Sequence, residues 1–163
     1  MKARKIAALA VLFTLCAGAA FAQAPDARVK KLLDTAKLYY EVNDYGNYRV
    51  LITLESDPER TQLVLVMSVT EDYFGTEIRE IVSVAGILPD YPDEYTMYNL
   101  MEENWTNKIG AWSMVQTDEG DVAVYYTVKV PANLSPKDLN NLINFVAKVC
   151  DKWEEEYLGG DDY

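Results

Sequence analysis

The chain has 163 residues, of which 26 are acidic and 15 basic, and it contains no histidine, so its formal net charge is −11. A surface this acidic repels phosphate backbones, and Lys30-Lys31 is the one adjacent basic pair after residue 22, so we expect no nucleic-acid partner. Without histidine, Ser-His-Asp or Cys-His catalysis and histidine-bound zinc are excluded, and no glycine-rich phosphate loop occurs, so the sequence predicts no enzymatic activity, metal or cofactor.

The first 22 residues have the three zones of a secretory signal peptide. A basic zone precedes an apolar run, and a small-residue cleavage site follows; they are Lys2 to Lys5, Ile6 to Ala17 and Ala20 to Ala22. The apolar run is too short for a lasting membrane span. The sequence therefore predicts cleavage after Ala22 and a periplasmic or secreted protein with no stable membrane span.

Cleavage would leave 141 residues with a net charge of −14, because three basic residues and no acidic ones are lost. This length suits one domain, expected over residues 23–157 and followed by an acidic tail over residues 158–163. One cysteine, Cys150, remains, and it cannot form an internal disulfide. Its place beside the apolar stripe of the last predicted helix favours a buried, inert thiol; an intermolecular disulfide is the alternative.

Four elements are predicted in the first half of the chain. Pro25-Asp26 favours the start of a helix whose apolar residues recur at helical spacing to about Tyr40. Three segments with strand patterns follow, and their connections are too short for a crossover helix, so we expect an antiparallel meander. The strands are predicted over residues 48–55, 62–69 and 77–88, with a loop over residues 71–75.

Four further elements are predicted in the second half. A helix over residues 94–108 precedes Gly110, a C-terminal stop, and a hairpin of residues 111–117 and 122–130 follows. Ser135, Pro136 and Asp138 favour the start of a last helix that continues to Tyr157. The order α-β-β-β-α-β-β-α predicts an α+β fold, a largely antiparallel sheet packed by helices, with the first and last helices on one face.

This order of elements and four short segments resemble the YbjN-like family, from about Leu32 to Tyr157. The segments are Arg60-Thr61-Gln62, Glu77 to Ile81, Asn104 with Gly110-Ala111-Trp112, and the closing helix after Leu134-Ser135. The resemblance implies the fold of the type III secretion chaperones and a regulatory or chaperone-like binding module without established enzymatic chemistry. Those chaperones act in the cytoplasm, whereas this chain carries a predicted export signal.

Three polar or aromatic residues in the matching segments have both structural and functional interpretations. Arg79 suits an anionic ligand or a partner's carboxyl terminus, but we favour a cross-strand ion pair on a solvated face. Asn104 is expected to bond the backbone at the corner between helix and strand. Trp112 is expected in the core or an interface, with a partner for its indole N–H.

Two places are candidates for partner binding. The adjacent aromatics Tyr73 and Phe74 are predicted in a loop, where they either dock on a partner or fold back over the sheet. On the middle helix the apolar residues cover more of the circumference than one stripe needs, and its outer side, centred on Tyr95, Met97 and Tyr98, is the predicted homodimer or partner interface. The alternative is that the Tyr73-Phe74 loop covers this side within the monomer.

Three functions are compatible with these features. The first is an exported YbjN-like binding or regulatory module that engages a peptide or protein partner in a chaperone-like manner. The second is a structural homodimeric subunit without a ligand, and the third is a hydrolase that uses paired carboxylates. The acidic residues Asp118, Glu119 and Asp121 suit a hairpin turn, with calcium ligation as the alternative.

Overall fold

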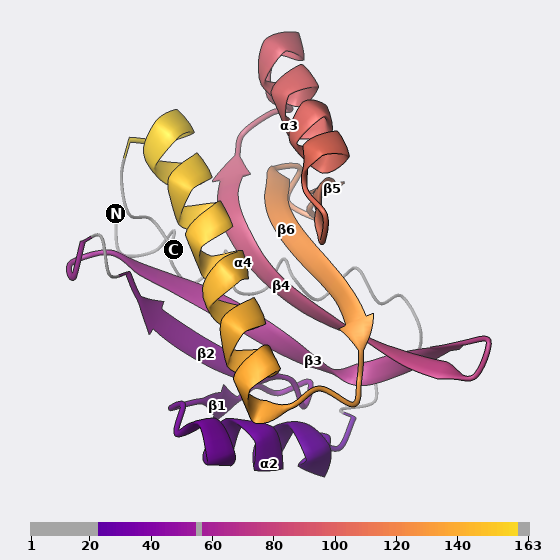
Figure 1. The fold of residues 1–163 in the computed structure, drawn as a ribbon. Helices are drawn as coiled ribbons and strands as arrows, with labels where there is room; N and C mark the ends of the chain where they lie inside the picture. The colour runs from indigo at the N-terminus through magenta and orange to yellow at the C-terminus, as the bar shows by residue number, and fades with distance from the viewer. Residues whose placement is uncertain (1–22, 55–56, 160–163) are drawn as a thin grey trace.

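The computed structural model describes residues 23–54 and 57–159, so the predicted signal peptide and residues 160–163 of the predicted tail lie outside the described residues. The described chain has an α+β fold with an antiparallel sheet packed by helices, which confirms the predicted class (Figure 1). The helices are α2 (Ala27–Ala36), α3 (Glu94–Thr106) and α4 (Pro136–Tyr157). The strands are β1 (Glu41–Val42), β2 (Tyr48–Thr53), β3 (Thr61–Tyr73), β4 (Thr76–Leu88), β5 (Ala111–Gln116) and β6 (Val122–Pro131).

The sheet has the strand order β1-β2-β3-β4-β6-β5, and every neighbouring pair is antiparallel. Strands β2 to β4 form the predicted meander, and β1 extends it at the edge of the sheet. Helix α3 then carries the chain past one position, so that β5 becomes the edge strand and β6 fills the place between β4 and β5. The two-residue strand β1 was not predicted, because Glu41-Val42 is too short to show an alternating pattern.

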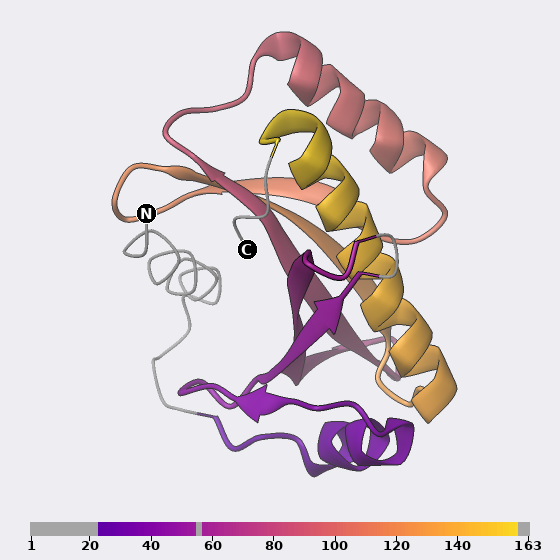
Figure 2. The ribbon, with the colours of Figure 1, turned by 90° about the vertical axis from the view of Figure 1, so that its left-hand side faces the viewer.

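The three helices lie on the same side of the sheet (Figure 2). Helix α4 crosses β2, β3, β4 and β6 and also contacts α2, whereas α3 packs beside β5. The first and last helices therefore share one face, as predicted, and the middle helix joins them on that side. The core between the helices and the sheet includes Leu33, Ile81, Tyr126, Ile143 and Trp153, all buried.

The local sequence explains why α4 begins where predicted. The Ser135 hydroxyl oxygen accepts a hydrogen bond from the Asp138 backbone N–H at 3.1 Å, and the same hydroxyl donates to the Asp138 carboxylate at 2.7 Å. Pro136 occupies the first turn, where its missing N–H costs nothing. This helix provides the longest packed surface over the sheet.

The boundaries of two other elements differ from the prediction. Helix α2 ends at Ala36 instead of about Tyr40, because Lys37 adopts a left-handed conformation with φ 59° and bonds back to the Asp34 carbonyl. Strand β3 continues to Tyr73, which pairs with Thr76 across a turn of only Phe74 and Gly75. Both turn residues have positive φ, 52° and 85°, as in a type I′ hairpin, so Glu71 to Tyr73 belong to a strand rather than a loop.

The corner between α3 and β5 depends on Gly110. This residue has φ 79°, and a Cβ atom there would lie 2.5 Å from the Tyr126 ring. The Tyr126 hydroxyl donates a hydrogen bond to the Ile109 carbonyl at 2.6 Å. Helix α3 ends at Thr106, and the glycine brings β5 back under it by a close approach to Tyr126.

Candidate partner-binding surfaces

Helix α3 is attached to the domain along one side only. Its N-cap is Asp93, whose side chain accepts from the Thr96 N–H at 2.8 Å, and Thr96 and Leu100 are the buried residues of the helix. At 100° per residue these two positions lie close together on the circumference. They define the side of α3 that faces the domain.

Polar side chains one turn further along lock α3 to β5. The Asn104 side chain accepts from the Trp112 N–H at 2.6 Å and donates to the Trp112 carbonyl at 3.3 Å. The Trp112 indole N–H donates to the Glu103 carboxylate at 2.7 Å. The predicted roles of Asn104 and Trp112 are confirmed, and Trp112 is buried in the core.

The opposite side of α3 exposes large apolar side chains. Tyr95 is 73% exposed, Tyr98 63%, Met101 66% and Trp105 87%. Spacings of three and four residues place all four within about one third of the circumference, across from Thr96 and Leu100. We call these four residues the α3 outer face. Of the predicted residues, Tyr95 and Tyr98 belong to this face, whereas Met97 is half-buried at its margin.

The sequence prediction centred the interface on Tyr95, Met97 and Tyr98 and left Met101 and Trp105 outside the centre. The sequence did not show how the helix is rotated about its axis. Spacing shows which apolar residues share a stripe but not which stripe faces the sheet. The Asn104 contact with Trp112 turns Trp105 outward.

The hairpin between β3 and β4 extends away from the body of the domain (Figure 1). Phe74 is fully exposed at its tip, and Tyr73 is about half exposed. The hairpin does not fold back over α3, so the alternative in which it covers the middle helix within the monomer is wrong.

The prediction that Arg79 lies on a solvated face is wrong. Arg79 is 1% exposed, and its guanidinium donates to the Asp26 carboxylate at 2.5 Å and to the Met67 and Ser68 carbonyls. In β4 its side chain points to the helix-covered side, where the N-cap of α2 supplies the carboxylate. Arg79 therefore forms a buried ion pair that joins α2 to the sheet.

The electrostatics of this pair centre on Asp26. Burial on its own would raise the pKa of the Asp26 carboxyl, but hydrogen bonds from the Arg28 side chain and backbone and from Arg79 outweigh it and lower the pKa to about 2. The Asp26 backbone is held as well, since its carbonyl accepts from the Tyr48 hydroxyl and its N–H donates to Ser68. Arg79 therefore has a structural role in attaching α2 to the sheet.

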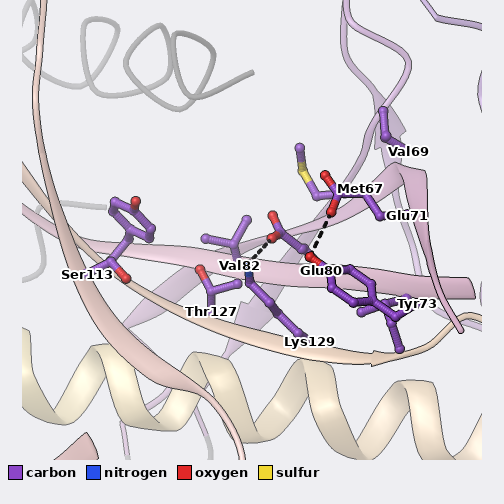
Figure 3. Close-up of a pocket in the computed structure, with 11 residues that line it drawn as sticks. Met67, Val69, Glu71, Tyr73, Glu80, Val82, Ser113, Thr127 and Lys129 are labelled. Carbon is purple, nitrogen blue, oxygen red and sulfur yellow. Dashed lines mark hydrogen bonds and ion pairs between the residues drawn. The ribbon is translucent and has the colours of Figure 1, made fainter. Parts of the chain in front are cut away.

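A groove lies on the face of the sheet opposite the helices (Figure 3). Its volume is about 320 Å³. Residues from β3, β4, β5 and β6 line it, and no described helix lies on that side. Tyr73, one of the predicted binding residues, is among the lining residues, whereas Phe74 is not.

The remaining candidate residues have structural positions. Asp118, Glu119 and Asp121 form the turn between β5 and β6, in which the Thr117 N–H donates to the Asp121 carbonyl at 2.7 Å. Cys150 is buried, as predicted, and burial raises the pKa of its thiol to about 12, which disfavours the reactive thiolate.

Neither a metal cluster nor a spanning helix is found in the part of the chain that the structure describes. Over residues 23–54 and 57–159, no three or more Cys, Asp or Glu side chains are grouped to hold a metal ion. Over the same ranges, no helix combines the length and apolar character needed to cross a membrane.

Comparisons with protein-family models, curated proteins and solved structures find no match to this chain. The resemblance to the YbjN-like family therefore stays a prediction from the segments and element order given above.

Proposed function

We propose that this protein is an exported, non-enzymatic binding module of YbjN-like type that docks on a protein or peptide partner through the α3 outer face. The observation that carries the proposal is the exposure of Tyr95, Tyr98, Met101 and Trp105 on one side of a helix whose other side is packed. Tyrosine, tryptophan and methionine are the residues enriched where proteins bind one another. The exposed carboxylates of Glu94 and Glu102 lie on the same side of the helix, so the face combines large apolar side chains with polar groups, as protein interfaces do.

The attachment of α3 supports the same proposal. Asn104 and Glu103 fix the helix to β5 and Trp112, so the outer face is presented by a rigid element. A rigid face loses little conformational entropy on binding, which favours affinity. The chaperone-like manner of binding and the export rest on the sequence resemblance and on the predicted signal peptide.

The test compares partner capture by two double variants of equal charge change. Tyr98→Glu with Trp105→Glu places two charges on the α3 outer face, and Asn133→Glu with Asn141→Glu places two on exposed positions elsewhere. Affinity capture from the compartment where the protein resides should recover a partner with wild type and with the control but not with the α3 variant. Equal capture by all three proteins would contradict the proposal.

A second candidate, a homodimeric subunit, is favoured by the free edge of β5. The backbone N–H and carbonyl of Trp112 both bond to the Asn104 side chain, so they point away from β6. In an antiparallel pair every second residue of a strand points the same way, so the backbone groups of Met114 and Gln116 also point away from β6. The strand contains no charge and no proline, the usual protections of an edge. A second copy could pair Met114 with Gln116 across a two-fold axis.

Proline substitution tests the homodimer without damage to the sheet. Gln116→Pro removes an N–H that points outward, so the ladder with β6 is spared while pairing with a second copy is blocked. If the protein is a β5-linked dimer, light scattering should show a dimer for wild type and a monomer for Gln116→Pro. If the wild-type protein is a monomer at high micromolar concentration, the homodimer is ruled out. Binding of a different partner protein through the α3 outer face then remains as the proposed function.

A further inference from the structure

The groove on the open face of the sheet is apolar at its base. Met67, Val82 and Tyr125 line it from three strands, and Val82 and Tyr125 are buried. The extended β3–β4 hairpin forms one wall, to which Val69, Tyr73 and Ile78 contribute. Val69 and Tyr73 are both substantially exposed, so apolar surface remains available at the wall.

The rim of the groove carries more negative than positive charge. Glu71 and Glu80 line it, and Lys129 is the one cation among its lining residues. Lys129 and Glu80 form an ion pair at 2.9 Å, and the Glu71 carboxylate accepts from the Tyr73 hydroxyl at 3.2 Å (Figure 3). The net charge of these ionised groups is −1, on a chain whose total is −11.

We propose that this groove is a second docking site, for a segment of a partner protein in which an apolar side chain lies next to lysine or arginine. The apolar side chain enters between Met67, Val82 and Tyr125, and the cation reaches the Glu71 carboxylate, since Glu80 is already paired with Lys129. This inference goes beyond the α3 outer face, because the groove lies on the opposite side of the sheet. Charge complementarity decides the occupant.

The same charges argue against the other ligands that an apolar groove attracts. A fatty acid or an anionic lipid headgroup would place its negative charge beside Glu71, and Lys129 is already neutralised by Glu80. The volume of about 320 Å³ suits one or two side chains rather than a whole lipid chain with its headgroup. Burial raises the pKa of Tyr125, and the negative charge of Glu80 raises it further, consistent with an acidic apolar site.

Binding of short model peptides tests the groove directly. The probes are a fluorescent seven-residue peptide of alternating lysine and leucine, the same peptide with glutamate for lysine, and decanoate as the lipid probe. We expect the wild-type protein to bind the lysine peptide, with affinity that falls as salt rises, and to bind neither of the other two.

Three variants locate the site. Glu71→Gln with Glu80→Gln should weaken binding of the lysine peptide about tenfold, since two rim charges are lost. Val69→Lys should weaken it at least as much, because a cation then occupies the wall. The control, Glu155→Gln with Glu156→Gln, removes the same charge from the exposed side of α4 and should bind like wild type.

The inference is overturned if the lysine peptide does not bind at low salt, if the glutamate peptide or decanoate binds equally well, or if the control loses as much as the groove variants. These results leave the α3 proposal intact, because partner capture through Tyr98 and Trp105 is a separate measurement. Loss of capture by the α3 variant with normal peptide binding would show that the two sites are independent.

Discussion

The two faces of the sheet differ in how far their polar and apolar side chains are buried. Under the helices, several polar side chains are buried and form pairs, such as Arg79 with the partly buried Asp26, and Gln62 with Glu154 at 2.6 Å. On the open face the ion pair of Lys129 and Glu80 stays in solvent, and apolar side chains such as Val69 are exposed. The covered face therefore fixes the fold, and the apolar groups left outside it are available for binding.

The largest expected effect is a loss of stability when the ion pair under the helices is broken, compared with the ion pair on the open face. Arg79→Met should lower the free energy of unfolding by about 3 kcal/mol, because the Met67 and Ser68 carbonyls lose their donor and the Asp26 carboxylate keeps only Arg28. Lys129→Met should lower it by less than about 1 kcal/mol, since its pair is exposed. Urea unfolding followed by circular dichroism measures both, and equal losses would contradict the comparison.

A somewhat smaller effect concerns the pH dependence of stability under the helices. Because the pKa of Asp26 in the folded protein is about 2, below the ordinary value of 3.8, its carboxylate stabilises the fold above pH 3.8, and this contribution is lost as the pH falls through 2. At neutral pH the contribution is roughly 2 kcal/mol.

The measurement is urea unfolding of wild type and Asp26→Asn between pH 7 and pH 2. The stability difference between them should be largest above pH 5 and should shrink towards zero at pH 2. Asp118→Asn, in the exposed β5–β6 turn, is the control and should follow wild type throughout. A difference that does not change with pH would show that the Asp26 charge contributes nothing.

The smallest effect is expected at the tip of the β3–β4 hairpin. Phe74 has φ 52° and no shielding from solvent, whereas asparagine is preferred in this turn position. Phe74→Asn should therefore leave the stability unchanged or raise it by up to about 1 kcal/mol. Thermal unfolding checks this, and a clear loss of stability would mean that Phe74 packs in the fold.

Local signals predicted most of the fold. The Ser135 cap, the strand alternation in β2 and the short connections act within a few residues, and they gave the element order and the antiparallel sheet. The failures came from longer-range or weaker signals. The turn at Phe74-Gly75 lacks the usual Asn-Gly or Asp-Gly pair, so the sequence predicts a loop over residues 71–75, whereas Glu71 to Tyr73 belong to the end of β3.

The candidate surfaces were predicted only in part. The burial of Arg79 depends on Asp26, 53 positions away, and no local pattern links the two. Likewise, the spacing of apolar residues in the middle helix indicates that they cover more than one side of it. Which side faces outward is decided by the contact of Asn104 with Trp112, which turns Trp105 to the outside. The groove was missed because its lining comes from four strands brought together by the topology.

Photo-crosslinking in the cell tests the central claim, that the α3 outer face contacts a partner protein. Benzoylphenylalanine is placed at Tyr98, in the middle of that face, and separately at Asn141, which is exposed on α4. After irradiation, the protein labelled at Tyr98 should give a covalent species of higher mass, and the protein labelled at Asn141 should not. The absence of an adduct at Tyr98, or the same adducts at both positions, would contradict the claim.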